Sequence, residues 1–327
     1  MSGLIEFLIF IYLRTKFELN IFIQIRLNRQ KLAKISLNWD FSEILQNIQK
    51  DHAKCKRKIF MEFAFAFFTF VIIPFGIFEI SNRNEFALVG LIPWFMVLIF
   101  VHFGRIQLFW TEYKRLFKQN FISQIVKDIN PNFSYQYDKF LTKNSGILRY
   151  DYTRNEDFIG GKYENVDFEL VEFYKGDTYK KQKGAIFACD FYKDFDFDLK
   201  IENKKIQMFE NTEVLDNIEF NEIFIVTGKD KVEIRYLLTP SFMERLLQIA
   251  KNPDFGIVSA AFSQNKFYVF LENNKDLFEP YLFFAPNLYL AKYYKMEILN
   301  FLSLIDELNL TLNIYPKTAL KNQKFTR

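Results

Sequence analysis

The chain has 327 residues, with 43 basic against 39 acidic side chains, so its net charge is only +4. This balance lacks the concentrated basicity of nucleic-acid-binding proteins, and we expect no nucleic-acid partner. Cys55 and Cys189 are the two cysteines. They form no metal-ligand spacing, disulfide framework or CxxC pair, so we expect neither a metal nor another cofactor. The length allows one or two domains.

The N-terminal segment, residues 1–38, is compatible with three interpretations. Apolar and mostly polar residues alternate from Phe17 to Leu27, a pattern typical of a strand. The same stretch, with its Lys and Arg neighbours, also suits a membrane surface. In the third interpretation, residues 1–37 precede the natural start of the folded chain. A cleaved signal peptide is not expected, because the apolar run Leu4–Leu13 contains Glu6 and lacks a basic n-region.

Two long apolar runs predict a pair of membrane spans at about residues 59–80 and 86–104. The first contains the uncharged stretch Phe63–Phe78, and the second runs from Phe86 to Phe103 with His102 as its one polarisable side chain. A span needs about 20 predominantly apolar residues, which both runs approach or exceed. The alternative is a pair of buried helices in a large soluble core.

Basic residues flank the two runs and predict their orientation. The segment "KCKRK", 54–58, precedes the first run, and Arg105, Lys114 and Arg115 follow the second. Because such residues favour the cytoplasmic side, we expect a multi-pass protein of a bacterial inner membrane with both termini cytoplasmic. An amphipathic helix starting near Asp40 leads into the first span, and a long helix continues from the second span to about residue 130. These helices and the hairpin make up residues 39–130.

Residues 131–314 predict a cytoplasmic α+β domain. Short strand-like segments dominate, including "YENVDFELVEF", "GAIFACDFY" and "GIVSAAFSQNKFYVFLEN". "NEIFIVTGKDKVEIRYLLTP" predicts two strands joined around residues 228–230, and Thr239 with Pro240 predicts the start of a helix. The last helix is expected over residues 288–308. This order favours a mainly antiparallel sheet with helices packed against it. Residues 315–327 form a basic tail.

Three patterns resemble chemical sites only superficially. Asp194, Asp196 and Asp198 alternate with Phe, which suits the solvated face of a strand better than a calcium loop. The "GGK" at residues 160–162 lacks the rest of a phosphate-binding loop, and we interpret it as a turn before a strand. Cys189 lies in an apolar strand with no histidine in the domain to activate it, so we interpret it as a small buried side chain.

Three residues remain as candidates for an interaction site: Arg235, Asp190 and Glu279. Arg235 is either an anion or partner contact or the partner of an acid on a neighbouring strand, such as Glu222. Asp190 together with Glu172 or Glu279 would form a carboxylate pair, which can perform acid and base chemistry when burial separates the two pKa values. Nothing in the spacing of these residues requires that they converge.

Several blocks of the chain resemble a known family. "YQYDKFLTKNSGILRYDYTRNEDFIGGKYENVDFELVE", "KGAIFACDFYKDF", "EIRYLLTPSFMERLL" and "DLFEP" are similar to successive blocks of the bacterial DUF3137 family. The resemblance extends over about residues 40–285. It implies a membrane-anchored cytoplasmic α+β domain, without an established activity. Family members are sometimes encoded near LemA-family membrane proteins, which implies a LemA-like partner.

Two functions follow as expectations. The first is a non-enzymatic, membrane-anchored module that binds another protein or the lipid surface, with an undetermined oligomeric state. Its basic tail, 315–327, and the juxtamembrane basic residues suit anionic headgroups, although topology charge and solvation explain them equally well. The alternative is a carboxylate-dependent enzyme acting at the membrane surface.

Overall fold

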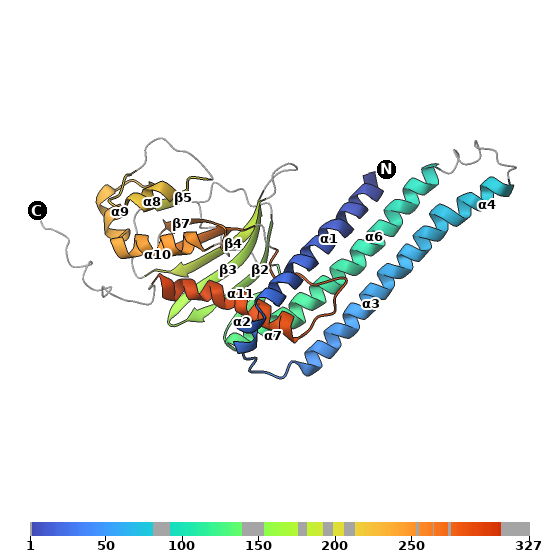
Figure 1. Cartoon of the computed structure of the whole chain (residues 1–327), viewed down its shortest axis with the longest axis horizontal. Helices are drawn as coiled ribbons and strands as arrows, with labels where there is room; N and C mark the ends of the chain where they lie inside the picture. Colours follow the sequence, from blue (N-terminus) through green and yellow to red (C-terminus); the bar gives the residue numbers. More distant parts are fainter. Residues whose placement is uncertain are drawn as a thin grey trace, which may run out of the picture. The chain divides into compact units, whose positions relative to one another are not determined.

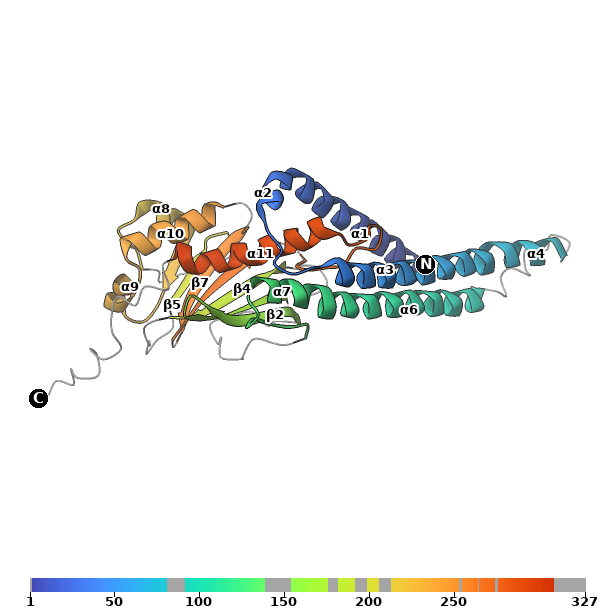
Figure 2. The ribbon, with the colours of Figure 1, turned by 90° about the horizontal axis from the view of Figure 1, so that it is seen from below.

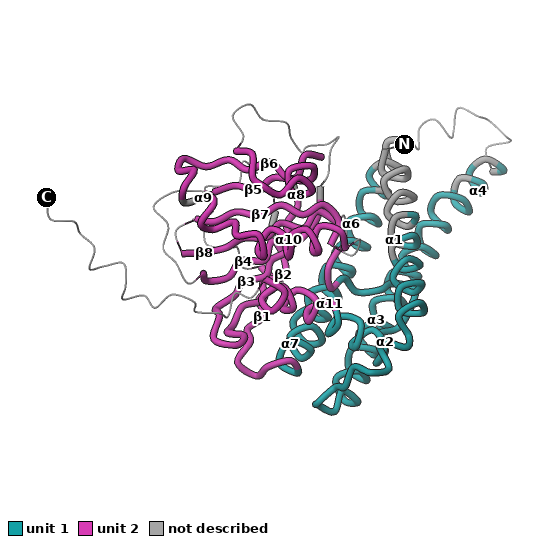
Figure 3. Tube along the Cα trace, turned by 60° about the vertical axis from the view of Figure 1, so that its left-hand side comes forward, with its two compact units in different colours: residues 1–128, 279–296 teal, residues 129–278, 297–327 magenta. Residues whose placement is uncertain are grey.

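The computed structural model describes residues 2–80, 92–138, 154–175, 182–191, 199–205, 213–252, 255–263, 265–273 and 276–308. The chain divides into two compact units (Figure 3). The helical unit combines Met1–Asp128 with Glu279–Met296, and the sheet unit combines Ile129–Phe278 with Glu297–Arg327. The segment 279–296 therefore returns to the helical unit after most of the sheet unit has been built.

Helices account for most of the described residues among the first 129, and residues 35–41 connect two of them (Figure 1). Their bounds are α1 Ser2–Leu27, α2 Arg29–Lys34, α3 Ser42–Phe67, η1 Phe68–Ile72, α4 Ile73–Ile80, α6 Ile92–Leu116, η2 Phe117–Ile122 and α7 Ser123–Ile129. Both η segments are short π-helical turns. The strand-like interpretation of residues 17–27 is therefore wrong, because this stretch is part of α1. The helix expected near Asp40 is confirmed, and the Asp40 carboxylate accepts a hydrogen bond from the backbone N–H of Ser42.

The first apolar run forms one continuous helical rod made of α3, η1 and α4. Pro74 has no backbone N–H to donate, and the π-helical turn of η1 directly precedes it, which absorbs the break in the helical hydrogen-bond ladder. Within the described part of the chain, one helix, Ser42–Ile77, is long and apolar enough to cross a membrane. The other expected span coincides in part with α6, and residues 81–91, which include its beginning and the predicted turn, lie outside the described residues.

The helices α3 and α6 pack along one another, as Figures 1 and 2 both show. Their contact seam is buried at Ile59, Ile106 and Trp110. The outward faces of α6 and of the continuous helix formed by α3, η1 and α4 are apolar yet exposed: Phe65 is 60% exposed, Phe75 65% and Phe100 65%. A soluble protein rarely leaves a contiguous apolar surface of this kind uncovered.

The sheet unit contains an eight-stranded sheet among its described residues, and every neighbouring pair is antiparallel. The spatial order is β1-β2-β3-β4-β8-β7-β5-β6. The strands are β1 Ser134–Gln136, β2 Arg154–Tyr163, β3 Val166–Lys175, β4 Gln182–Asp190, β5 Leu199–Asn203, β6 Phe224–Thr227, β7 Ile257–Ser263 and β8 Lys266–Glu272. This confirms the mixed fold with a mainly antiparallel sheet.

The helices of the sheet unit are α8 Ile218–Ile223, α9 Lys231–Leu237, α10 Pro240–Lys251 and the C-terminal part of α11 Leu288–Glu307. Figure 2 shows α10 and α11 on the same side of the sheet. Phe242 of α10 packs its ring against Phe262 and Phe267, which point to one face of the sheet. Tyr163, on that same face, donates a hydrogen bond from its hydroxyl to Asp306 of α11. We call this the helix face.

The opposite face of the sheet has an apolar cluster of its own. Side chains alternate along a strand and directly opposed residues share a face, so the register defines the members of this cluster. They are Phe158, Val171, Phe173, Ile186, Ala188, Ala261, Tyr268 and Phe270, all buried. The core of the sheet unit therefore extends over both faces of the sheet.

Local turn chemistry explains some of the connections. β2 and β3 form a hairpin whose two loop residues, Glu164 and Asn165, both have positive φ, as a type I′ turn requires. β7 and β8 form the second predicted hairpin, and Thr239 caps α10 by accepting a hydrogen bond from the N–H of Phe242.

Two predicted elements in the sheet unit are wrong. The hairpin expected around residues 228–230 is a strand followed by a helix, because Asp230 accepts a hydrogen bond from the N–H of Val232 and begins α9. The "GGK" segment is not a turn before a strand. It lies inside β2, and the turn comes at Glu164 and Asn165.

Candidate functional site

An open hollow of about 430 Å³ lies in the sheet unit beside β1, β2 and β3. Its size falls within the range of small-ligand clefts. It is lined by Asn132, Ser134, Phe158, Gly160, Gly161, Lys162, Asp167, Phe168, Glu169 and Lys266. In the strand register, Phe158, Gly160 and Lys162 belong to the opposite face of the sheet, away from the face that α10 covers.

The floor of the hollow depends on two adjacent glycines. A Cβ atom on Gly160 would lie 2.8 Å from the ring of Phe158, and one on Gly161 would lie 2.5 Å from the ring of Phe133. Each ring therefore packs directly on glycine backbone, one on each side of β2. The apparent phosphate-loop fragment is explained by this packing and not by a phosphate-binding turn.

Charged side chains of both signs form the rim. Lys162 lies 3.8 Å from the Asp167 carboxylate, and Lys266 lies 3.7 Å from Glu169 and 3.9 Å from Asp190. All three separations exceed hydrogen-bond distance, and the side chains are partly exposed. Exposed ion pairs of this kind contribute at most about 1 kcal/mol, so a ligand can replace them at little cost.

Asp190 therefore lies beside the hollow, at the end of β4 and opposite Lys266 of β8. Glu172, which the sequence suggested as a partner for it, points to the helix face of β3. The two carboxylates lie on different faces of the sheet and do not converge. The rim has an aromatic wall and both signs of charge, an arrangement that suits binding through charge complementarity more than acid and base catalysis.

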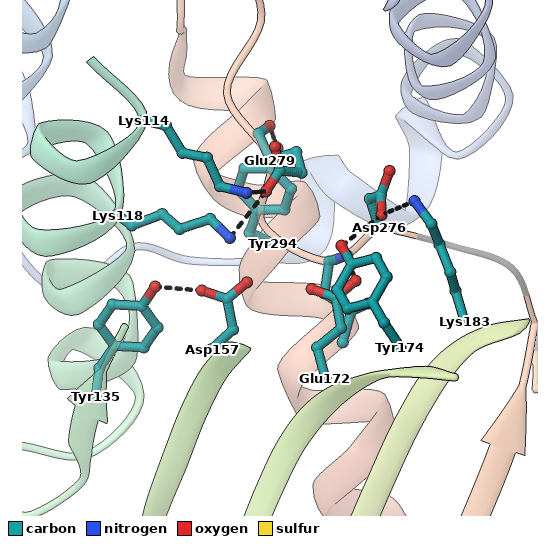
Figure 4. A network of polar contacts seen from close by, with 11 residues as sticks. Lys114, Lys118, Tyr135, Asp157, Glu172, Tyr174, Lys183, Asp276, Glu279 and Tyr294 are labelled. Atoms are coloured by element: carbon teal, nitrogen blue, oxygen red, sulfur yellow. Dashed lines mark hydrogen bonds and ion pairs between the residues drawn. The ribbon is translucent and has the colours of Figure 1, made fainter. Parts of the chain in front are cut away.

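The helix face carries three buried acids near the middle of β2 and β3: Glu156, Asp157 and Glu172. Glu156 and Glu172 are directly opposed in the register. Glu172 accepts a hydrogen bond from the N–H of Leu277, and Asp157 accepts one from the hydroxyl of Tyr135 (Figure 4). These acids are thus held by local donors. Sequence reasoning missed Glu156 and Asp157.

Asp157 marks a β-bulge. Between Glu156 and Ile159 the register gains one residue on β2, and Asp157 has a φ of 59°. A non-glycine residue in the left-handed region is uncommon, and aspartate tolerates it better than most. The bulge redirects the side chains that follow it. A "NED" sequence within a strand-like run is the one signal that points to it.

Another polar cluster holds the segment after β8 against β3 and β4. Asp276 accepts hydrogen bonds from the hydroxyl of Tyr174 and from the amine of Lys183, and that amine also lies over the Tyr174 ring (Figure 4). These contacts join β3 and β4 to the segment that leaves the sheet. We assign them a structural role.

Glu279 belongs to the helical unit, where it forms a buried ionic centre. Its Oε1 atom lies 2.6 Å from Lys114 Nζ and 2.9 Å from Lys118 Nζ (Figure 4). Its backbone carbonyl accepts a hydrogen bond from the hydroxyl of Tyr294. Burial raises the pKa of Tyr294 well above its usual value, so this hydroxyl stays protonated at neutral pH. Through these contacts, Glu279 has a structural role in the helical unit.

Arg235 lies on α9 and forms an ion pair with Glu213 at 3.1 Å. Lys231, one turn earlier on the same helix, binds the same carboxylate at 2.9 Å. Of the two roles considered for Arg235, the structure shows an ion pair with an acid, but the acid is Glu213 and not Glu222. The reason is that α9 replaces the expected strand and turns Arg235 toward the segment before α8.

Cys189 is buried, as predicted, and burial raises the pKa of its thiol. It is therefore unsuited to act as a nucleophile at neutral pH. Asp194, Asp196 and Asp198 lie outside the described residues.

His102 forms a polar cluster within the helical unit. Its Nδ1 lies 2.8 Å from Glu62, and Arg105 lies 3.0 Å from the other oxygen of the same carboxylate. Glu62 is buried between α3 and α6, next to the exposed apolar faces of these helices. Buried ionisable side chains between apolar helices are rare and are usually paired.

Comparisons with known proteins find one matching family model. The DUF3137 family model, described as a protein of unknown function, matches residues 180–310. This confirms the predicted resemblance to the family over residues 180–310, a range nearer the C-terminus than the predicted residues 40–285. No curated protein matches the chain.

Among solved structures, the crystal structure of the mycobacterial trehalose monomycolate transport factor A, TtfA, matches with a TM-score of 0.38 and 11% identity. It covers 62% of this chain and 97% of that one. At this similarity, the likeness carries no argument about function.

Proposed function

Because residues 180–310 carry a DUF3137 domain, we propose that the protein is a non-enzymatic binding module anchored in a bacterial inner membrane by a two-span hairpin. The sheet unit lies in the cytoplasm and offers the hollow beside Lys162 and Lys266 to a protein partner. Its partner is a component of the same membrane assembly, with a LemA-like membrane protein as the first candidate.

One observation carries the anchoring proposal: the helix Ser42–Ile77 is long and apolar enough to span a bilayer, and its apolar residues face outward. On a helix of this length, lipid is the environment that best accommodates exposed Phe side chains. The exposed Phe100 and Val101 of α6 extend the same apolar surface to the neighbouring helix and support a second span.

The polar cluster around Glu62 supports a position for the membrane boundary. Apolar exposure on α3 begins at Phe60 and Met61, one turn or less from Glu62. Arg105 of the same cluster is more than half exposed, as expected of a side chain that reaches lipid headgroups. The basic residues 54–58 lie just before this level and favour the cytoplasmic side.

The hollow supports the binding half of the proposal. Its ion pairs are long and exposed, so a charged ligand segment can displace them without leaving a buried charge unpaired. Asp190 and Glu172, the carboxylate pair that an enzyme would need, lie on different faces of the sheet. We therefore prefer a binding module to an enzyme.

Purification of the full chain in a mild detergent tests the proposal. A stoichiometric membrane partner is expected, and Lys266→Glu should reduce its recovery several-fold because three acids would then face one another at the rim. Lys251→Glu is the matched control, since Lys251 pairs with Glu219 away from the hollow. Equal recovery of the partner with both variants would contradict binding at the hollow. Extraction of the chain from membranes by alkaline carbonate would contradict the membrane anchor.

A further inference from the structure

We infer that the C-terminal half of α1 forms a docking surface of its own, which binds an amphipathic helix with acidic flanks from a protein partner. This surface belongs to the helical unit, whereas the hollow belongs to the sheet unit. The inference goes beyond the proposed function, and one of its steps rests on the proposed membrane hairpin.

From Glu18 onward, α1 is apolar on a side that the rest of the chain leaves uncovered. Glu18 and Ile21 are buried on the other side. The uncovered side carries large apolar residues at helical spacing, and their exposed fractions reach 73% at Leu27. They are Leu19, Phe22, Ile23 and Leu27. A helix that packs on one side needs one apolar face, so this additional apolar face indicates a missing partner.

The segment 284–289 widens this apolar side. The ring of Phe22 stacks on that of Phe284 with 5.6 Å between centroids, and the guanidinium of Arg29 lies 5.9 Å from the centroid of Tyr289. Phe284, Leu288 and Tyr289 are all exposed. We call these three residues, together with the exposed apolar residues of α1, the α1 surface. Contiguous exposed apolar residues of this kind mark interaction sites, whereas single ones are common on any protein.

The charges around the α1 surface are basic. Residues 12–39 contain six basic residues and one acid, Glu18. Glu18 is only 1% exposed and accepts hydrogen bonds from the backbone N–H groups of Leu282 and Phe283, so its charge is withdrawn from the surface. Five basic side chains on α1 and α2 are exposed: Lys16, Arg26, Arg29, Lys31 and Lys34.

This charge favours an acidic partner and argues against a second copy of the chain. Two copies that met through the α1 surface would bring their basic side chains together, which opposes association. Asp and Glu residues beside the apolar face of a partner would pair with the same side chains. An amphipathic helix presents such a face through residues at i, i+3, i+4 and i+7, the mode by which helices bind apolar surfaces.

An anionic bilayer would also match this charge, but the α1 surface lies too far from the proposed membrane boundary at Glu62. The N–H of Leu282 binds Glu18, and its carbonyl oxygen lies 2.9 Å from Nε2 of His52 on α3. Glu18 and His52 therefore share one level of the helical unit. From His52 to Glu62, ten residues rise about 15 Å, whereas the headgroup layer of one leaflet is roughly 5–8 Å thick. After Glu18, α1 runs on in the direction of α6, away from that boundary (Figure 1).

Peptide binding to the full chain in phosphatidylcholine nanodiscs tests the inference. Two labelled helical peptides of about five turns would share a face of Leu, with Glu at the polar positions of one and Lys in the other. Empty nanodiscs give the background. We expect the acidic peptide to bind about ten-fold more tightly than the basic one in fluorescence anisotropy, and Arg26→Glu should reduce this preference about five-fold.

A second variant tests the apolar part of the α1 surface. Leu19→Asn combined with Ile23→Asn should weaken binding of the acidic peptide about ten-fold, and both side chains are exposed, so folding should not depend on them. Val232→Asn is the matched control, because Val232 is a 79% exposed apolar residue of the sheet unit. It should leave binding unchanged, as should Lys266→Glu at the hollow.

Four results would overturn the inference. The first is equal affinity of the two peptides, and the second is unchanged binding in both variants of the α1 surface. The third is weakening by Lys266→Glu to the same extent, since the peptide would then occupy the hollow. The fourth is a label on Ile23→Cys that lipid-borne doxyl groups quench, or disulfide-linked dimers of this variant, which would assign the α1 surface to the membrane or to a second copy.

The same measurements separate this inference from the proposed function. Cys55 and Cys189 are buried, so the unsubstituted chain gives the labelling background. A label on Phe65→Cys that doxyl groups leave unquenched would contradict the membrane anchor. Preference for the acidic peptide, together with an unquenched label at residue 23, would still support the α1 surface in that case.

Discussion

Lys118 Nζ lies 2.9 Å from Oε1 of Glu279, and both side chains are buried in the helical unit. The two residues are 161 positions apart, so this contact ties the returning segment 279–296 to the helix that continues α6. Lys114 reaches the same oxygen from one turn earlier. A single carboxylate thus pairs with two lysines and fixes the path of the segment.

Glu279→Gln should destabilise the protein by about 3–5 kcal/mol, because it leaves the buried Lys118 and the partly buried Lys114 without their shared carboxylate. Chemical unfolding in detergent measures this change. Glu112→Gln is the control, since Glu112 is half exposed and forms only a 3.9 Å pair with Lys58. The control should change stability by less than about 1 kcal/mol. Equal effects of the two substitutions would contradict the structural role of Glu279.

Glu62→Ala should weaken the packing of α3 against α6, because His102 and Arg105 would both lose their acceptor. We expect a loss of about 2 kcal/mol, less than for a fully buried pair, since Arg105 is largely exposed. The measurement is the unfolding free energy in mixed micelles. His102→Asn, which retains the Arg105 contact, should cost less. A larger loss in His102→Asn than in Glu62→Ala would argue against the carboxylate as the centre of the cluster.

The protein should lose stability in alkaline solution above about pH 10, the usual tyrosine pKa. Burial raises the pKa values of Tyr281 and Tyr294 in the folded state, so the unfolded chain releases these protons first. Their contribution is fully present below pH 10 and is lost as the pH rises toward the folded-state values, by up to about 1.4 kcal/mol per pH unit and group.

Unfolding curves between pH 8 and 12 test this dependence. Tyr294→Phe should lower stability at pH 8 by about 1 kcal/mol, because it removes the hydrogen bond to the Glu279 carbonyl. It should also flatten the alkaline decline. Tyr289→Phe, at an exposed position, should leave the decline unchanged. An unchanged slope in Tyr294→Phe would show that Tyr294 does not contribute to it.

The turn between β2 and β3 offers a stabilising change. Glu164 and Asn165 both have positive φ, which Asn-Gly adopts with less strain. Glu164→Asn combined with Asn165→Gly should raise the unfolding free energy by up to about 1 kcal/mol, measured by thermal unfolding. Glu164→Val, a β-branched residue at the same position, should lower it. A reversed order of these two variants would contradict the assigned turn.

The elements that the sequence predicted correctly have local signals. Thr239 and Pro240 start α10 as expected, because a cap and a first-turn proline act within a few residues of each other. The β7–β8 hairpin has strong strand formers on both sides of a short loop. The apolar runs predicted helices that are confirmed from residue 92 onward in α6 and throughout Ile59–Ile80.

The errors occur where two periodicities fit the same residues. In α9, Val232, Ile234 and Tyr236 alternate as a strand would, yet Ile234, Leu237 and Leu238 are the buried set, with helical spacing. In α1, apolar and polar residues alternate over residues 17–27 and suggested a strand. The segment is a helix whose buried positions include the acidic Glu18. Its partners, Leu282 and Phe283, lie more than 260 residues away, so local patterning could not reveal them.

The hollow could not be predicted because it depends on long-range strand pairing. Asp190 and Lys266 become neighbours only when β8 pairs with β4 across 76 positions of sequence. Asp190, a candidate from the sequence, lies beside the hollow, and Glu172, one of the two partners suggested for it, lies on the other face of the sheet. Glu156 and Asp157 were missed because a bulge places them, and a bulge has little sequence signature.

The membrane hairpin is the central claim, and a topology measurement tests it most directly. Reporter fusions that are active on only one side of the membrane would be placed after Asn82, between the two predicted spans, and after Arg327. The account predicts opposite sides: the fusion after Asn82 outside the cytoplasm, and the fusion after Arg327 in the cytoplasm. Both reporters on the same side would contradict the two-span hairpin.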